Sequence, residues 1–366
     1  MAKPVNIQIE GKDYFGWYYE EQTKIKHRVL SAYAKIWISK LGKYNETLFF
    51  DCHAGCGAYI DQETNEVSYG SSFLIEDIAC ALNSKRNSKN FICTCEINKN
   101  YYNNFKKVME DIGKKTISLK NDDFQNVLCD PRVRRYYSTH PTLFFVDPFG
   151  YTMKMTSIAK MMDNRKNEVI INFMYDFINR FLSVTDPNIL NAFFGSNDWE
   201  KASDMSGTER ERFLVDLYKR KLQEATGAKY VYAYRLCFAD KDQTYYYLVH
   251  ATNNIQGITY MKDSFASVNY GRVEYLGKRH DEISLFDLTE FKSYDFAQRA
   301  LKRFSSQRRT FDYIWEKVAD TVPYTSKDLS EALDVLQKEG KVTIIRETSK
   351  RGQYKGRDLI VFGEDL

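Results

Sequence analysis

An aspartate and a proline at the end of an apolar run are the residues of this chain best suited to chemistry. Asp147 and Pro148 follow residues 143–146 and precede Phe149. A carboxylate and the Pro148 carbonyl can accept the two N–H bonds of an exocyclic base amine while a methyl group arrives in line, and Phe149 or Tyr151 can stack on an extruded base. The alternative is an acidic residue and a proline in a surface turn.

A pair of glycines follows an earlier apolar run. Gly55 and Gly57 come after residues 48–52, where glycine lets the backbone turn sharply and approach a ligand. The phosphate-binding form of this motif has a third glycine three residues on, and that position is Ile60. The pattern disfavours a pyrophosphate ligand and leaves open an adenosyl ligand without phosphates. A plain tight turn is the alternative.

Two further acidic residues end the next apolar runs. Glu96 can accept both ribose hydroxyls, and Asp123 can hold an adenine amino group while Phe124 covers the ring. Either acid can instead cap a helix. Glu96 follows Gly55 by about 40 residues rather than the ~20 of a dinucleotide-binding fold, which disfavours a nicotinamide-dependent oxidoreductase. These side chains all fall where successive strands end, and open α/β sheets bind ligands at that edge.

The elements that must position these residues alternate along the chain. Short apolar runs alternate with helical stretches, which predicts a parallel sheet covered by helices. The expected strands are 48–52, 91–97, 116–119, 142–146 and 169–174, and the expected helices between them are 71–83, 98–112, 124–137 and 156–163. Residues 230–239 and 245–251 predict a closing antiparallel hairpin. Such an ending is typical of the Rossmann-like class I methyltransferase variant of the doubly wound fold.

The C-terminal part has the order of a winged helix-turn-helix. Helices are expected over 310–319, from Thr325 or Ser326, and over 331–339, followed by strands at 342–345 and 359–362. Basic residues suited to nucleic-acid phosphates gather here. They are Arg308, Arg309, Lys350, Arg351, Lys355 and Arg357. A winged helix that serves only for dimerisation is the alternative.

Composition limits the class of protein. The 366 residues carry 53 Lys and Arg against 49 Asp and Glu, a net charge of +4, so any contact with nucleic acid must be a local patch. No apolar run approaches the ~20 residues of a membrane span, and the first ten residues resemble no signal peptide, so a soluble, cytoplasmic protein is expected. The 7 cysteines are scattered, and Cys52, His53 and Cys56 lack a second ligand pair. No metal site is expected.

Several short motifs together resemble one family. They are Lys24-Ile25-Lys26-His27, the Asp-x-x-Ala-Gly-x-Gly-x-Tyr stretch at 51–59, Gly70-Ser71, residues 146–150, residues 171–174 with Asn179-Arg180-Phe181, and Thr252-Asn253 with Gly257 and Met261-Lys262-Asp263. This set is similar to the three-Cys-motif partner proteins (TcmP), and the resemblance spans most of residues 15–362. The family is methyltransferase-like, some members end in a winged helix, and a neighbouring gene encodes a three-Cys-motif protein. The box at 147–150 also resembles that of tRNA guanine-N2 methyltransferases, but Phe149 replaces the second proline of the usual amine-methylating box.

The sequence therefore predicts an α/β Rossmann-like methyltransferase with a C-terminal winged helix. The expected domains are an N-terminal helical cap (1–45), an S-adenosylmethionine-binding domain (46–270, with a helical insertion at about 175–227), a linker (271–306) and the winged helix (307–366). The expected cofactor-binding residues are Lys26, Asp51, Ala54, Gly55, Gly57, Tyr59, Glu96, Asp123 and Phe124, and the catalytic ones are Asp147, Pro148, Phe149 and Tyr151.

The leading hypothesis for function is methyl transfer from S-adenosylmethionine to a nucleic-acid base amine. The alternative is a catalytically weak cofactor-binding subunit that recruits nucleic acid for its three-Cys-motif neighbour, in defence against mobile elements. A homodimer is compatible with either hypothesis.

Overall fold

The computed structural model describes residues 4–86, 89–277, 285–346 and 356–363. The chain divides into two compact units. The first contains residues 1–257 and 275–277, and the second contains residues 258–274 and 278–366. The domain limits expected from the sequence stay a prediction.

A mixed sheet forms the centre of the first unit. Its order is β10 (Tyr230–Cys237), β11 (Thr244–Thr252), β9 (Glu168–Phe173), β8 (Thr142–Val146), β3 (Thr47–Asp51), β6 (Asn90–Cys95) and β7 (Ile117–Lys120). Strands β3, β6, β7, β8 and β9 are parallel, and β11 runs antiparallel to both β9 and β10. Every residue of β3, β8 and β9 is buried, which is why these strands are largely apolar on both faces. The predicted parallel sheet with an antiparallel terminal hairpin is confirmed.

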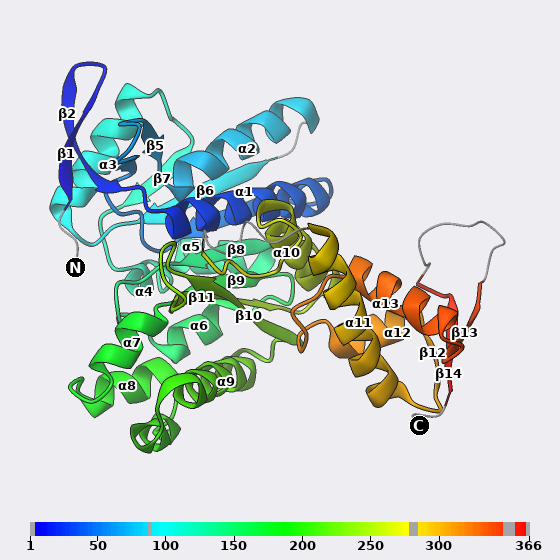
Figure 1. The fold of residues 1–366 in the computed structure, drawn as a ribbon. Helices are drawn as coiled ribbons and strands as arrows, with labels where there is room; N and C mark the ends of the chain where they lie inside the picture. Colours follow the sequence, from blue (N-terminus) through cyan, green and yellow to red (C-terminus); the bar gives the residue numbers. More distant parts are fainter. Residues whose placement is uncertain (1–3, 87–88, 278–284, 347–355, 364–366) are drawn as a thin grey trace. The chain divides into compact units, whose positions relative to one another are not determined.

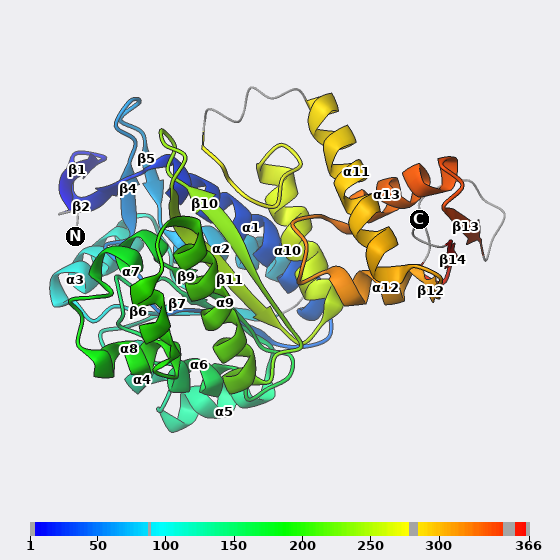
Figure 2. The same ribbon diagram turned by 60° about the horizontal axis from the view of Figure 1, so that its bottom comes forward.

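Helices cover both faces of this sheet (Figures 1 and 2). One face carries α1 (Glu21–Leu41), α2 (Ser71–Arg86) and α3 (Lys99–Asp111). The other carries α4 (Phe124–Val127), α5 (Pro131–Thr139), α6 (Met155–Met161), α7 (Tyr175–Phe181), α8 (Pro187–Phe194), η1 (Asp198–Asp204) and α9 (Gly207–Thr226). The single helix expected over 124–137 was wrong, because Asp130 caps a new helix that begins at Pro131. Proline is tolerated in the first turn of a helix but not in its interior.

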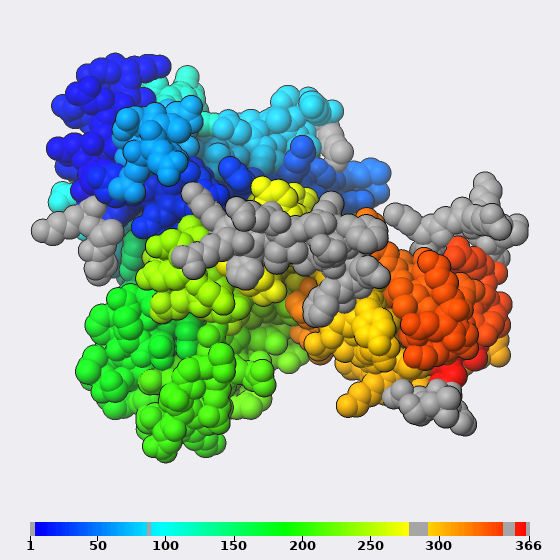
Figure 3. All heavy atoms as spheres, in the orientation of Figure 1, coloured from blue at the N-terminus to red at the C-terminus, as the bar shows by residue number. Residues whose placement is uncertain are grey.

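A small second sheet precedes and flanks the glycine loop. Strands β1 (Val5–Ile9) and β2 (Lys12–Tyr18) form a hairpin, and β2 pairs in parallel with β4 (Ala58–Ile60), which pairs with β5 (Val67–Tyr69). Figure 3 shows the hairpin in dark blue against the lighter blue segment that holds β4 and β5. The N-terminal segment is therefore a hairpin followed by a helix, and the sequence analysis anticipated only the helix.

The second unit holds most of α10 (Ile255–Val268) and the winged helix. Its elements are α11 (Leu285–Phe304), β12 (Arg308–Thr310), α12 (Phe311–Val318), α13 (Ser326–Lys338), β13 (Val342–Ile345) and β14 (Leu359–Phe362). The strands order as β12-β14-β13. Two separate helices expected from Thr325 to Glu339 were wrong, because Thr325 and Asp328 form a capping box and one helix runs on from there. Trp315 anchors α10 to α12, since its Nε1 donates to Thr259 Oγ1 at 2.8 Å.

Candidate active site at the ends of the parallel strands

The loop after β3 is shaped by its two glycines. Gly55 and Gly57 have φ values of +62° and +84°, which side chains rarely tolerate. A Cβ on Gly57 would lie 2.9 Å from the rings of Phe73 and Phe105, so this glycine is required for packing. A Cβ on Gly55 would meet only Trp17 Nε1, at 3.7 Å. Gly55 therefore leaves its side of the loop open for the close approach of a ligand.

Glu96 ties the end of β6 to this loop. Its Oε2 accepts the backbone N–H of Gly55 at 2.9 Å, and its Oε1 accepts that of Asn98 at 2.7 Å. The neighbouring loop residue Ala54 donates its N–H to the Cys95 carbonyl at 2.8 Å. Burial raises the pKa of Glu96 despite these two hydrogen bonds. The strand end and the glycine loop thus form one rigid corner with a partly desolvated carboxylate.

Asp51 connects the end of β3 to the start of α2. The side chain is fully buried, and its Oδ2 accepts the hydroxyls of Ser71 at 2.5 Å and Ser72 at 2.8 Å. Its Oδ1 accepts the backbone N–H of His53 at 3.2 Å. Burial raises the pKa of Asp51 against the opposing effect of these hydrogen bonds. Asp51 therefore fixes the start of the glycine loop, at His53, to the start of α2.

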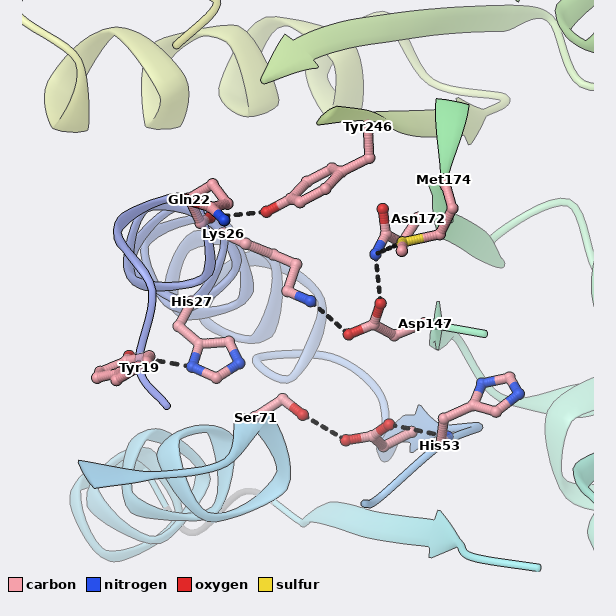
Figure 4. A network of polar contacts seen from close by, with 11 residues as sticks. Tyr19, Gln22, Lys26, His27, His53, Ser71, Asp147, Asn172, Met174 and Tyr246 are labelled. Atoms are coloured by element: carbon pink, nitrogen blue, oxygen red, sulfur yellow. Dashed lines mark hydrogen bonds and ion pairs between the residues drawn. The ribbon is translucent and has the colours of Figure 1, made fainter. Parts of the chain in front are cut away.

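Asp147, at the end of β8, lies in a polar network (Figure 4). Its Oδ2 accepts Lys26 Nζ of α1 at 2.5 Å, and its Oδ1 accepts Asn172 Nδ2 of β9 at 2.5 Å. Burial raises the pKa of Asp147, but the Lys26 ammonium and the hydrogen bonds outweigh it and hold that pKa below its ordinary value. Asn172 Oδ1 is buried and has no hydrogen-bond partner among the described residues. Lys26 was expected near the cofactor, and the structure shows it paired with the Asp147 carboxylate.

A buried histidine borders the same network. His27 Nδ1 lies 3.0 Å from the Tyr19 hydroxyl, and its ring packs 5.2 Å from the ring of Tyr59 (centroid to centroid). Burial, helped by the nearby Lys26 charge, lowers the pKa of His27 to about 3, so the imidazole is neutral at pH 7. Figure 4 shows Tyr19 and His27 on the side of the network away from Asn172. Tyr59, expected at the cofactor, thus lies in this aromatic group.

Aromatic rings follow Asp147 along the chain, and the structure separates their roles. Phe149 is 52% exposed, and its ring lies 5.9 Å from that of Trp17, which also contacts Tyr101 at 5.5 Å. Tyr151 instead donates its hydroxyl to the Ile178 carbonyl at 2.9 Å and packs on the protein interior. Phe149 is therefore the ring available to a flat acceptor.

The acidic residue after β7 is a helix cap. Asp123 accepts the backbone N–H of Gln125 at 2.8 Å at the start of α4. Phe124 is only 3% exposed, and its ring lies 5.0 Å from that of His53. The structure thus brings Asp51, Gly55, Glu96 and Asp147 to one edge of the sheet, whereas Phe124 offers little surface to a ligand.

Three residues of this site were not singled out individually in the sequence. Asn172 belongs to the quoted motif at 171–174, and His27 to the quoted motif at 24–27, so these motifs were the available signal. Trp17 lies on the unanticipated hairpin and carried no signal.

The expected nucleic-acid contacts belong to the second unit. Arg308 and Arg309 are neighbours on β12, and Arg357 is exposed just before β14. Lys350, Arg351 and Lys355 lie outside the described residues.

In the described ranges, no group of three or more His, Cys, Asp or Glu side chains could hold a metal ion. No helix there is long and apolar enough to cross a membrane.

The C-terminal part of the chain is similar to one protein family, and several solved structures resemble the chain distantly. Residues 276–349 match the family model of the GMT-like wHTH domain, and no curated protein sequence matches the chain. Trm1 from Pyrococcus horikoshii, solved with S-adenosyl-L-methionine, is 11% identical with a TM-score of 0.41 over 96% of both chains. LPL1258 from Legionella pneumophila is 12% identical with a TM-score of 0.39 over 64% of this chain and 85% of its own. An rRNA methylase from Streptococcus thermophilus is 10% identical with a TM-score of 0.30 over 60% of this chain and 92% of its own.

The order of the strands in the central sheet defines the class of fold. Numbered along the chain, the sheet reads 3-2-1-4-5-7-6, with the seventh strand antiparallel. This chain has the Rossmann-like fold of class I methyltransferases, and its C-terminal part is a winged helix-turn-helix domain similar to the GMT-like wHTH family.

Proposed function

We propose that this chain is an S-adenosylmethionine-dependent methyltransferase that acts on an exocyclic amine of a nucleic-acid base. The observation that carries the proposal is that Asp51, Glu96 and Asp147 stand at the ends of the adjacent parallel strands β3, β6 and β8, with Glu96 bound to the N–H of Gly55. Open α/β sheets bind their ligands at this edge.

The charges of the site fit S-adenosylmethionine better than a pyrophosphate cofactor. S-adenosylmethionine carries positive charge on its sulfonium and its amino group. Burial raises the pKa values of Asp51 and Glu96, so ionising them is costly, and a cationic ligand would offset that cost. An anionic dinucleotide would meet carboxylates instead. The bound cofactor supplies the methyl group. In this proposal Glu96 holds the ribose hydroxyls, and Gly55 lets the adenosyl group lie against the loop.

Asp147 and Phe149 would act on the acceptor. The Asp147 carboxylate and the Pro148 carbonyl accept the amine N–H bonds and orient the nitrogen lone pair toward the methyl group. Lys26 and Asn172 hold the carboxylate ionised and fixed. Phe149 stacks on an extruded base, because its ring is half exposed beside Asp147 in the chain.

A catalytically weak, cofactor-binding subunit is the second candidate. The Lys26 ammonium already occupies one oxygen of Asp147, and an acceptor amine must compete with it. In this alternative the chain recruits nucleic acid for a three-Cys-motif partner protein, as its resemblance to the TcmP family implies.

A methyl-transfer assay with labelled S-adenosylmethionine and total nucleic acids tests the proposal, with and without the three-Cys-motif partner. We expect Asp147→Asn to abolish transfer while cofactor affinity stays within a few fold, because Asp147 contacts the acceptor. Asp163→Asn, at an exposed position, is the matched control. Asp147→Asn leaves the buried Lys26 ammonium without its partner, which can itself unfold the protein. The double variant Lys26→Met with Asp147→Asn removes that unpaired charge, so it distinguishes a loss of activity from a loss of folding. Transfer that survives Asp147→Asn would disprove the catalytic assignment.

A further inference from the structure

The helix that usually reads nucleic acid in a helix-turn-helix is poorly charged for that task here. In helix-turn-helix proteins the second helix of the motif enters the major groove of DNA, and here that helix is α13. It carries Asp328, Glu331 and Asp334 against Lys327 and Lys338. Lys327 Nζ also lies 3.7 Å from the Glu331 carboxylate. A helix with excess negative charge is repelled by phosphates, so α13 is a poor source of attraction for nucleic acid.

A cluster of two cations and one aromatic ring lies on β12 and α12. The guanidinium carbon of Arg309 is 5.1 Å from the centroid of the Tyr313 ring, and Lys317 Nζ is 5.5 Å from the same centroid. Tyr313 is 38% exposed, and Lys317 is exposed. Neither cation forms an ion pair with any residue that the structure describes, and the Asp312 carboxylate points to Gly356 instead. Two like charges therefore gather around one exposed ring, and no carboxylate of the described ranges forms an ion pair with either.

The register of β12 fixes Arg309 in this cluster. Arg309 pairs with Ile360 of β14, whose side chain is fully buried, so Arg309 leaves the strand on the face that packs inward. Its Nη1 donates to the Arg308 carbonyl at 3.2 Å, and its Nε is buried with no hydrogen-bond partner among the described residues. The buried Nε cannot reach a ligand, so any contact with a phosphate oxygen falls to the terminal nitrogens of this guanidinium, which is held in place by the strand.

We infer that the winged-helix unit holds a nucleic-acid phosphate between Arg309 and Lys317, beside Tyr313, and that α13 does not provide the contact. This inference rests on the proposed function, which supplies nucleic acid as the substrate. The contact is independent of base sequence, because it reaches only the backbone.

Binding of the full chain to mixed-sequence oligonucleotides, followed by fluorescence anisotropy between about 50 and 200 mM salt, tests the inference. Single-stranded and duplex DNA and RNA are the probes. We expect Arg309→Gln with Lys317→Gln to weaken binding and to make the slope of log affinity against log salt shallower by about 0.7 to 0.9, for one lost phosphate contact. Lys327→Gln with Lys338→Gln makes the same charge change on α13 and should leave affinity and slope unaltered. Arg309→Lys with Lys317→Arg should retain the slope.

The outcomes separate this inference from the proposed function. An equal loss in both double variants, a loss confined to the α13 variant, or no loss in either would overturn the inference. Calorimetric titration of S-adenosylmethionine into the same proteins checks folding and the cofactor site. If the wild type binds cofactor but no oligonucleotide, the nucleic-acid part of the proposed function fails as well. If it binds oligonucleotide and the Arg309 and Lys317 variant binds equally, only the inference fails.

Discussion

At the scale of single residues, the ion pair between Lys26 and Asp147 links the carboxylate that we propose as catalytic to the stability of the fold. Lys26 is 5% exposed, so removing Asp147 would leave a buried ammonium without its partner, at a cost of about 3–5 kcal/mol. The pair also explains why Asp147 stays ionised in a partly buried position. Because its pKa is lowered, the stabilisation from this carboxylate is present above its ordinary pKa of about 4 and is lost as pH falls through the folded value.

His27 gives the site a distinct dependence on pH. Its folded pKa of about 3 lies below the ordinary value of 6.5, so between these values the unfolded chain binds a proton that the folded chain does not. Stability therefore falls as pH drops below about 6.5. We expect the free energy of unfolding to fall by about 2 kcal/mol more in the wild type than in His27→Gln between pH 7.5 and 5.0. Urea titration at the two values measures this difference.

The half-buried His140 provides the control for the substitution itself. Between pH 7.5 and 5.0, the free energy of unfolding of His140→Gln should fall by nearly as much as that of the wild type. That of His27→Gln should fall by less. Equal losses in the wild type and His27→Gln would show that His27 is not held neutral by the fold.

At the scale of elements, the N-terminal hairpin depends on one side chain of α3. Asn104 Oδ1 accepts the Phe15 N–H at 2.7 Å, and its Nδ2 donates to the carbonyls of Phe15 at 2.9 Å and Cys56 at 2.7 Å. This amide joins β2 to the glycine loop, and β2 brings Trp17 to Gly55. The hairpin is therefore a wall of the candidate cofactor site rather than an appendage.

Asn104→Ala should loosen this wall. The loss leaves three backbone groups without their partner, each worth about 1–3 kcal/mol where it stays buried. We expect faster amide hydrogen exchange at residues 14–17 and 55–57 and weaker binding of S-adenosylmethionine. Asn103→Ala, at the exposed neighbouring position, is the matched control. Unchanged exchange in Asn104→Ala would mean that strand pairing alone holds the hairpin.

The sequence predicted the central sheet better than its surroundings for a physical reason. Buried parallel strands are continuous apolar runs, and residues 142–146 were located without error. Short strands such as β4 have mixed burial and little periodicity, so they were missed. Asp51, Glu96 and Asp147 could be located because each follows a predicted strand, and parallel strands of one sheet end at the same edge. The partnership of Lys26 with Asp147 joins residues 121 positions apart, and local patterns carry no such information.

At the scale of the whole molecule, the chain combines a methyltransferase fold with a winged helix. The two compact units separate the two tasks of the proposed function, cofactor chemistry in the first and nucleic-acid contact in the second. The motif Met261-Lys262-Asp263 fits this division, because Lys262 is fully buried and donates to the Val322 carbonyl within the second unit. That motif stabilises the winged-helix unit and need not touch a ligand.

Calorimetric titration of the full chain with S-adenosylmethionine and its demethylated product tests the central claim most directly. We expect saturable binding, which Glu96→Ala weakens by roughly 1.5–3 kcal/mol through the loss of charged hydrogen bonds. Glu110→Ala, at an exposed position on α3, should bind as the wild type does. A flat titration with both ligands, on wild-type protein shown to be folded, would contradict both hypotheses, that the chain is a methyltransferase and that it is a cofactor-binding subunit.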